Sequence, residues 1–353
     1  MDDGKLVLVS GASGYVASHC IKLLLEKGYR VRGTVRSLKN AEKVNPIRKL
    51  DPSGAQLELV EADLMQDETW PRAVKDCTYV LHVASPIGQG ASQAFIDAAV
   101  RGATSVLRAC GNEPSVKKVV QTSSTMAICD GNNPPKSKYD ETDWTPIELQ
   151  NSGWYTQSKV LAERAAWELW KSGELKNKFD FTVINPGFIV GPPLTDSTGS
   201  SMTLAIHIMT KPVIPVLNPN SIDVRDVAEA HIRAMERPET NGHRIIVADG
   251  APITLKEYGL QLKKVFGPLG YCPATTVLPQ FVIWIASFFV GDAGQLMKMQ
   301  FDKRVDNTKM QELLGMNSWR NPLDGMVDMV DELIERGLIK KTEKWEQTRR
   351  RNK

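Results

Sequence analysis

Short apolar runs alternate with segments of helical periodicity along the first half of the chain. The runs are rich in β-branched residues, which favour strands, and they lie at residues 5–10, 30–35, 57–60, 78–83, 118–121 and 181–184. Between them, apolar residues recur at helical spacing in the ranges 14–27, 40–50, 69–75, 90–110 and 152–171. Strands that are apolar on both faces and alternate with helices predict an α/β fold, a doubly wound parallel sheet covered by helices on both sides. Such sheets bind ligands beyond the carboxyl ends of their strands.

The alternation fades after about residue 190. Residues 130–150 are rich in Pro, Asn and Asp, and residues 191–220 contain five prolines, so both segments are expected to be long loops. A helix is predicted from Asp223 to Ala234, with Asp226 positioned to cap it, and a further strand from Arg244 to Val247. The remainder of the chain is expected to be mainly helical.

A glycine-rich turn, GASGYVA at residues 11–17, joins the first strand to the first helix. Gly11 permits a tight turn, Gly14 lets the backbone approach a pyrophosphate, and Ala17 keeps the helix close to the sheet. The amides at the helix N-terminus suit phosphate groups. Because the turn lies between a strand and a helix, it predicts a dinucleotide site rather than an ordinary turn.

The end of the second strand indicates which dinucleotide is bound. NAD sites usually carry an acidic residue there, but residues 30–41 contain none. Arg36 follows the strand directly and Lys43 lies close behind, and a guanidinium suits a 2′-phosphate. We therefore expect NADP (NADPH) rather than NAD, and not merely a solvated basic face. Asp63, after the third strand, is placed either to meet the adenine or to cap the strand end.

Tyr155 and Lys159 are separated by one helical turn, which places the phenol and the ammonium on the same helix face. A phenol beside a cation suits proton donation to a carbonyl that receives a hydride. The fifth strand ends in Thr122, Ser123 and Ser124, whose hydroxyls are expected at the ligand-binding edge of the sheet. The YxxxK spacing alone is a weak signal, but these hydroxyls and the glycine-rich turn strengthen it.

Composition and charge narrow the class of protein. The 353 residues are 42% hydrophobic and 24% charged, ordinary values that exclude a mainly disordered or collagen-like chain. Five scattered cysteines indicate neither a disulfide framework nor a metal site, so a reducing, cytoplasmic setting is expected. No secretory leader is recognisable, and the apolar run at 277–290 is too short to span a membrane, so a buried helix is expected there.

The net charge of +3 is too small to indicate nucleic acid as a partner. Residues 340–353 contain seven Lys or Arg and two Glu, a net charge of +5, which leaves −2 on the other 339 residues. The positive charge therefore belongs to a terminal tail, which we expect to be solvated or poorly ordered.

The motifs together resemble the extended short-chain dehydrogenase/reductases. They occur in the family's order over about residues 5–250: GASGYVA at 11–17, TVR at 34–36, LHVASP at 81–86, TSS at 122–124, YTQSK at 155–159 and NPG at 185–187. Residues 155–167 (YTQSKVLAERAAW) look most like the branch of dihydroflavonol 4-reductases and cinnamoyl-CoA reductases, which includes NADPH-dependent aldehyde and ketone reductases.

The resemblance implies a role for each matching position. Tyr155 would be the proton donor, Lys159 would support it and hold the nicotinamide ribose, and Ser124 would polarise the carbonyl, with Ser123 or Thr125 as alternatives. The positions expected to contact the cofactor are Gly11, Ser13, Gly14, Tyr15, Val16, Arg36, Lys43, Asp63, Leu64, Val83, Ala84, Ser85, Thr122, Ser123, Tyr155, Lys159, Pro186, Gly187, Ile189, Val190 and Ser201. The positions expected to contact the substrate are Ile87, Met126, Cys129, Trp154, Phe188 and Met202, although each is also a candidate core residue.

Two departures from the family pattern bear on the substrate and on proton transfer. Cys129 stands where the plant flavonoid enzymes carry an asparagine that reads substrate hydroxyls, which argues against a flavonoid substrate. Arg101-Gly102 stands where the family often has Asn-Gly, so a proton relay through that amide is not expected.

We therefore expect a Rossmann-type, NADPH-dependent reductase of hydrophobic aldehydes or ketones, acting as a monomer or homodimer without membrane insertion. The alternatives are a nucleotide-sugar epimerase or dehydratase, a hydroxysteroid dehydrogenase, and a dinucleotide-sensing protein without catalysis. The domain ranges that follow are 1–190 with 220–248 for the dinucleotide, 191–219 with 249–339 for a smaller, mainly helical substrate domain, and 340–353 for the tail.

Overall fold

The computed structural model describes residues 4–86, 92–130, 133–147, 153–196, 199–278 and 303–351. Its centre is a seven-stranded sheet in the order β10-β6-β5-β4-β1-β2-β3, in which every neighbouring pair is parallel. The strands are β1 (Leu6–Val9), β2 (Arg30–Val35), β3 (Leu57–Glu61), β4 (Tyr79–His82), β5 (Lys118–Thr122), β6 (Asp180–Pro186) and β10 (Arg244–Val247). The predicted doubly wound parallel sheet is thereby confirmed.

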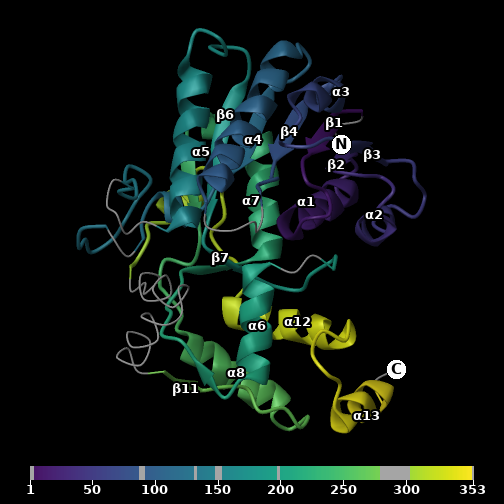
Figure 1. Ribbon diagram of the computed structural model, residues 1–353, viewed down its shortest axis with the longest axis vertical. Coiled ribbons are helices and arrows are strands. Elements are labelled where there is room, and N and C mark those ends of the chain that lie inside the picture. Colours follow the sequence, from purple (N-terminus) through teal and green to yellow (C-terminus); the bar gives the residue numbers. More distant parts are fainter. Residues whose placement is uncertain are drawn as a thin grey trace.

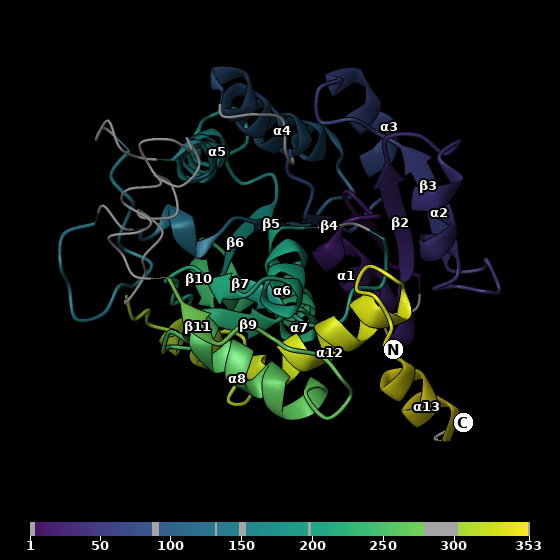
Figure 2. The same cartoon turned by 60° about the horizontal axis from the view of Figure 1, so that its bottom comes forward.

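Helices cover both faces of the sheet (Figure 2). One face packs against α1 (Tyr15–Glu26), α2 (Ala41–Arg48) and α7 (Val224–Glu236), and the other against α3 (Trp70–Val74), α4 (Gln93–Asn112) and α5 (Trp154–Lys171). Side chains of β1 alternate between the two cores: Val7 and Val9 face α1 and α7, whereas Leu6 and Leu8 face α4. This two-sided burial is why the strands read as continuous apolar runs.

A smaller group of helices packs together beyond the carboxyl end of the sheet (Figure 1). It consists of α6 (Ser200–Thr210), α8 (Leu255–Phe266) and α12 (Pro322–Glu335), which share one hydrophobic cluster. Tyr15, Met126 and Phe188, which follow β1, β5 and β6, pack against that cluster. The segments that leave the sheet edge are therefore covered by this helical group.

Short elements complete the described chain. Two small parallel pairs are β7 (Phe188–Val190) with β9 (Ser221–Asp223) and β8 (Val213–Ile214) with β11 (Thr276–Val277). The remaining helices are α11 (Thr308–Glu312) and α13 (Glu343–Arg351), together with the 3₁₀ turns η1 (Asp67–Thr69), η2 (Thr125–Ala127) and η3 (Pro238–Thr240). Within the described ranges, no helix is long and apolar enough to cross a membrane.

Two local predictions were wrong. The segment 191–220 is not a continuous loop, because α6 lies inside it, between its prolines. Helix α7 is capped by Asp223, whose carboxylate accepts from the amide of Arg225, and not by Asp226. Asp226 instead pairs with Arg320, 94 residues away. Local residue spacing reveals neither the helix α6 nor the pairing of Asp226. Helix α6 is stabilised by tertiary packing, and Asp226 is bound by a partner that is distant in sequence.

The terminal tail, expected to be solvated or poorly ordered, is largely exposed but forms a helix. Residues 343–351 form α13, and Trp345 at its start is 3% exposed. The cations of Lys341 and Arg349 lie 5.3 and 5.4 Å from the centre of its indole ring, and the indole nitrogen donates to Asp331 of α12. A single tryptophan among many charged residues is a weak sequence signal for an ordered helix. In the folded protein, burial of the indole nevertheless stabilises this charged segment. Most of the apolar run at 277–290 lies outside the described residues.

Candidate active site

The glycine-rich turn is pressed against the exits of two neighbouring strands. Gly11 adopts a left-handed backbone with φ of +69°, and a Cβ there would lie 3.1 Å from Cβ of Ala84, after β4. Its amide donates to the Thr34 hydroxyl of β2 at 2.9 Å. Gly14 is the N-cap of α1 and has no side chain to block the helix N-terminus. The turn therefore presents backbone amides at the sheet edge, as a phosphate site requires.

The predicted adenosine-side residues lie at the ends of β2 and β3. Arg36 follows β2 directly and is exposed, and Lys43 is half-exposed in the first turn of α2. The Asp63 carboxylate accepts from the amide of Met65 at 2.9 Å, so one of its oxygens caps the strand end. A hydrogen bond from the Leu38 amide to Glu61 closes the loop between the two strand ends.

A chain of hydrogen bonds holds the segment after β4. The His82 ring bonds the backbone carbonyl of Gly102 and, through Nδ1, the Ser10 hydroxyl at 2.9 Å. The Ser10 oxygen in turn accepts from the amide of Ala84 at 2.9 Å. Burial, with a smaller contribution from Lys159, lowers the pKa of His82 to about 4, so this imidazole is neutral at pH 7. The chain fixes residues 83–85 at the sheet edge.

The hydroxyls at the exit of β5 are also fixed. The Thr122 hydroxyl donates to Nε2 of His231 at 2.7 Å, because Nδ1 of that ring donates to the carbonyl of Val227. Burial lowers the pKa of His231 to about 4, which keeps the ring neutral. Ser124 is the N-cap of η2 and accepts from the Met126 amide at 3.2 Å. The predicted hydroxyls thus lie at the ligand-binding edge, each with a defined orientation.

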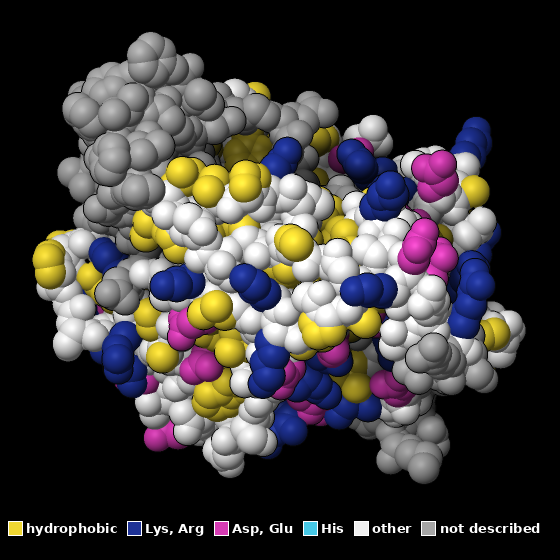
Figure 3. All heavy atoms as spheres, turned by 90° about the horizontal axis from the view of Figure 1, so that it is seen from below, with side chains coloured by type: hydrophobic (Ala, Val, Ile, Leu, Met, Phe, Trp, Pro, Cys, Tyr) yellow, Lys and Arg dark blue, Asp and Glu magenta, His cyan; other side chains and the backbone are white. Residues whose placement is uncertain are grey.

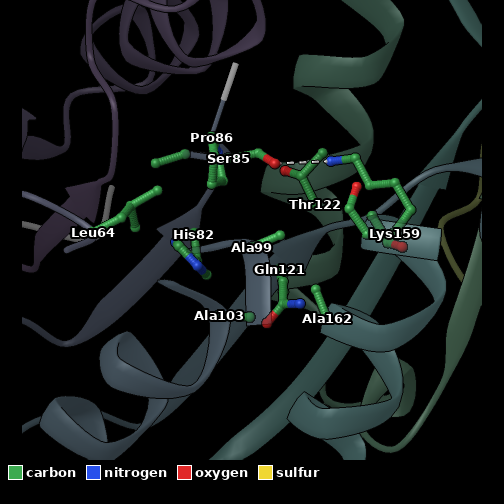
Figure 4. Close-up of a pocket in the computed structure, with 13 residues that line it drawn as sticks. Leu64, His82, Ser85, Pro86, Ala99, Ala103, Gln121, Thr122, Lys159 and Ala162 are labelled. Atoms are coloured by element: carbon green, nitrogen blue, oxygen red, sulfur yellow. Dashed lines mark hydrogen bonds between the residues drawn. The ribbon is translucent and has the colours of Figure 1, made fainter. Parts of the chain in front are cut away.

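Tyr155 and Lys159 lie on the first turns of α5, which borders η2 and hence the Ser124 loop. Tyr155 as a whole residue is 50% exposed, and the Lys159 ammonium lies 5.7 Å from the centre of its ring. Lys159 Nζ donates to the Ser85 hydroxyl at 3.2 Å (Figure 4). The structure therefore brings Lys159 of α5 against the exit of β4, which joins two predicted parts of the site.

A small cavity of about 20 Å³ lies behind this ammonium (Figure 4). Its polar lining includes His82, Ser85, Gln121 and Lys159. The carbonyl oxygen of the buried Gln121 side chain has no hydrogen-bond partner there. A cavity of this size and polarity has room for one water molecule.

The structure also locates the residues predicted on the nicotinamide side. Gly187 passes so close to β9 that a Cβ would lie 2.2 Å from the carbonyl oxygen of Asn220. Ile189 and Val190 lie in β7, and Ser201 is buried at the start of α6. Tyr15 is partly buried and donates to the carbonyl of Gly191 at 2.6 Å. The turn that begins α1 is thereby tied to the segment leading into α6.

The predicted substrate residues divide into two groups. Met126 and Phe188 are partly buried against the helical cluster, and Trp154 is half-buried at the start of α5. Met202 is buried inside that cluster, and Cys129 is buried in a separate one with Tyr139, Ile246 and Val305. Ile87 lies outside the described residues. The core interpretation of Met202 and Cys129 thus agrees with their burial.

Sequence reasoning missed a fully buried charged group beside the site. Glu163 of α5 is fully buried and pairs with Arg244 of β10 at 2.5 Å. The two residues are 81 positions apart, so no local spacing reveals the pair. The one signal was Glu163 itself, which interrupts the apolar spacing of the helix one turn after Lys159. Among the described residues, no group of three or more His, Cys, Asp or Glu side chains forms a metal site.

Fold and site together define a class of protein: an extended short-chain dehydrogenase/reductase, with the glycine-rich turn, the strand-end serine and the Tyr/Lys pair all at one sheet edge. Comparison with known proteins gives the family. The profile of the NAD dependent epimerase/dehydratase family matches residues 7–248, and the chain belongs to that family. Within it, the chain is an oxidoreductase of the branch of cinnamoyl-CoA and dihydroflavonol reductases.

Three relatives illustrate the similarity. A cinnamoyl-CoA reductase of Medicago truncatula is 35% identical over 252 residues, which cover 69% of this chain and 76% of that protein. A dihydroflavonol 4-reductase of Hordeum vulgare is 34% identical over 258 residues, which cover 70% of this chain and 72% of that protein. The crystal structure of the yeast methylglyoxal/isovaleraldehyde reductase Gre2 with NADPH superposes with a TM-score of 0.78 at 28% identity, covering 95% of this chain and 100% of that one.

Proposed function

We propose that this protein is an NADPH-dependent reductase that converts the carbonyl group of a hydrophobic aldehyde or ketone into an alcohol. The observation that carries the proposal is the convergence of Ser124, Tyr155 and Lys159 at the sheet edge beside the glycine-rich turn. The names of the relatives, a methylglyoxal/isovaleraldehyde reductase of yeast and a cinnamoyl-CoA reductase of Medicago truncatula, support a reductase acting on a carbonyl compound. No acidic residue ends β2, and the exposed Arg36 is there instead, which favours NADPH over NADH.

The residues at the sheet edge are of the kinds that would hold a dinucleotide. The open N-terminus of α1 would receive the pyrophosphate, and Arg36 with Lys43 would receive the 2′-phosphate. Gly187 and Val190 would lie on the nicotinamide side. When bound, NADPH would supply a hydride to the carbonyl carbon of the substrate.

The chain supplies the remaining steps. The Ser124 hydroxyl would donate a hydrogen bond to the carbonyl oxygen and stabilise the negative charge that develops there. Tyr155 would transfer its phenolic proton to that oxygen, which completes the alcohol. Lys159 would stabilise the resulting phenolate, and Ser85 holds its ammonium in place in the structure. The exposure of Tyr155 leaves the phenol open to a substrate.

The surroundings of the site support a hydrophobic substrate. Met126 and Phe188 expose part of their surface beside the catalytic elements, and both pack against the apolar cluster of α6, α8 and α12. We propose that residues 191–219 and 249–339 form the substrate-binding part, and residues 1–190 with 220–248 the dinucleotide-binding part. A nucleotide-sugar epimerase would need cations for a diphosphate in residues 188–215, and Lys211 is the only Lys or Arg there.

The test is NADPH consumption over a series of aliphatic aldehydes, aryl aldehydes, diketones and dihydroflavonols, with the wild-type chain and Tyr155→Phe. We expect turnover of at least one apolar carbonyl compound by the wild type. Loss of the transferable proton should lower kcat at least 100-fold in the variant, while NADPH binding, measured by fluorescence, stays within about threefold. Full activity of Tyr155→Phe, or turnover of UDP-sugars alone, would contradict the proposal.

A further inference from the structure

A buried ion pair stands directly behind the proposed catalytic groups. The Glu163 side chain is completely buried and that of Arg244 is 8% exposed, and they meet at 2.5 Å between Oε1 and Nε. Three further donors converge on the same carboxylate: the Ser123 hydroxyl at 2.5 Å, the Asn185 amide at 2.8 Å and the Trp167 indole at 3.2 Å. We call Glu163, Arg244, Ser123 and Asn185 the Glu163 clamp.

The clamp connects the elements that carry the site. Glu163 lies one turn after Lys159 on α5, Ser123 precedes Ser124 at the end of β5, and Asn185 is near the end of β6. The Asn185 amide also donates to the backbone carbonyl of Ser124 at 3.1 Å. A single carboxylate therefore bonds both the residue before Ser124 and the side chain that holds the Ser124 backbone.

Arg244 connects the clamp to the loop that precedes α5, at residues 141–145. Its Nη1 donates to the carbonyls of Glu141 and Asp143 at 3.0 and 2.8 Å, and its guanidinium lies 3.7 Å from the ring centre of Trp144. The Thr145 amide in turn donates to the carbonyl of Ala127 in η2 at 3.1 Å. Residues 141–145 are therefore hydrogen-bonded both to the loop that contains Ser124 and to the buried ion pair.

Directional bonds replace apolar contacts at the catalytic end of α5. Farther along the helix, Ala166 and Trp167 pack against Phe181 of the sheet in an ordinary core. Apolar contacts tolerate small shifts of a helix, because they have no preferred direction. Charge-assisted hydrogen bonds do not tolerate them, because their strength depends on distance and angle. The Glu163 clamp therefore lies at the end of α5 where Ser124 and Tyr155 must keep a fixed separation.

We infer that Glu163 is a positioning residue, which holds α5 in register with the β5 exit so that Ser124 and Tyr155 address the same carbonyl oxygen. Arg244 supplies the charge that permits a carboxylate at this buried place. The inference rests on the proposed reductase function, and it adds two residues to the machinery, neither of which touches substrate or cofactor. A small displacement of catalytic groups is enough to reduce a rate substantially.

The experiment compares two double variants, both of which remove the charge pair. Glu163→Met with Arg244→Met replaces the pair by apolar side chains of similar volume, which a core tolerates better than one unpaired charge. Glu163→Gln with Arg244→Met also removes the charges, but it keeps an oxygen that can accept from Ser123 and Asn185. Asp226→Asn with Arg320→Met is the matched control, because it removes a half-buried ion pair whose hydrogen bonds join Asp226 to Arg320 and not to the Glu163 clamp.

We expect kcat of the Met/Met variant to fall about 10- to 100-fold, with NADPH binding within threefold of the wild type. The Gln/Met variant should recover to within about threefold, and the control should keep its kcat even if its stability falls. A folded Met/Met variant with wild-type kcat would overturn the inference. Equal losses in Met/Met and Gln/Met would also overturn it, since the charge and not the bonding geometry would then be responsible.

Two further measurements distinguish a failure of this inference from a failure of the proposed reductase function. Ser123→Ala is the substitute test if the Met/Met variant does not fold. It removes one bond of the clamp with little change in packing, and we expect its kcat to fall about three- to tenfold. Amide hydrogen exchange over residues 123–128 needs no turnover, and protection there should drop in Gln/Met less than in Met/Met. An inactive wild type would contradict the proposed function alone, whereas unchanged exchange in both variants would contradict the clamp alone.

Discussion

Polar side chains around the site are either committed to internal hydrogen bonds or exposed. His82 and His231 are buried and neutral, and each connects a hydroxyl at a strand end to a backbone carbonyl. Tyr155 and Arg36 are exposed instead. The buried group fixes geometry without charge, which costs little in a dry interior, whereas the exposed group is available to a ligand.

Arg36 provides the residue-scale prediction. Arg36→Ala should raise the Michaelis constant for NADPH about 10- to 100-fold, because a charge-assisted contact to the 2′-phosphate is worth about 1.5–3 kcal/mol. NADH has no such phosphate, so its Michaelis constant should change less than about twofold. Steady-state kinetics with both cofactors measures the difference. Lys39→Ala is the control, since Lys39 is exposed three residues later, and equal effects of Arg36→Ala on both cofactors would show that Arg36 does not bind the phosphate.

At the scale of elements, order in the chain's last segment depends on one side chain. Helix α13 is strongly charged, and most of its side chains are exposed. Trp345 is its buried anchor, and the helix is further tied to α12 by pairs from Arg349 to Asp331 and Glu335. Such exposed or half-exposed ion pairs contribute little by themselves. Burial of the indole therefore provides most of the binding energy of α13.

Trp345→Ala is expected to lower the free energy of unfolding by about 3 kcal/mol, the usual cost of deleting a buried aromatic side chain. Urea denaturation followed by circular dichroism measures the change. Lys344→Ala, at the exposed neighbouring position, should change stability by less than about 0.5 kcal/mol. If the two variants unfold at the same urea concentration, α13 is not part of the cooperatively folded unit.

At the scale of the whole molecule, the excess positive charge is confined to the end of the chain and is not spread over the surface. Seen from below, Lys and Arg side chains are spread among acidic and hydrophobic ones across the helical end of the molecule (Figure 3). The net charge of +3 comes from the last residues, many of which lie in α13. The mixture of charges on this face suits a small-molecule enzyme better than a nucleic-acid-binding protein.

Acid stability is the prediction at this scale. Burial lowers the pKa of His19, His82 and His231 to about 4, whereas unfolding restores values near 6.5. The unfolded chain therefore binds more protons between pH 6.5 and 4, and stability must fall as the pH decreases through that window. One pKa unit corresponds to about 1.4 kcal/mol per group, so the three rings together make a large contribution.

Denaturant unfolding at several pH values between 7 and 4 measures this loss. Glu141 and Asp226 act in the opposite sense, because burial raises the pKa of both carboxyls, so they offset part of the loss. His231→Asn is the informative variant, since it removes one titrating ring and should make the decrease shallower. A stability that is constant from pH 7 to 4 would contradict the buried, neutral state of these histidines.

Local sequence patterns were sufficient to predict the sheet, the helices that cover it and the edge at which ligands bind. Strands buried on both faces and amphipathic helices leave a local periodic signal, and the glycine-rich turn and the Tyr155/Lys159 spacing are local as well. The tertiary structure alone decided the placement of α6, the cap of α7, the order of α13 and the Glu163–Arg244 pair. Each of these depends on partners that are distant in sequence, and burial, which makes such contacts strong, exists only once the chain has folded.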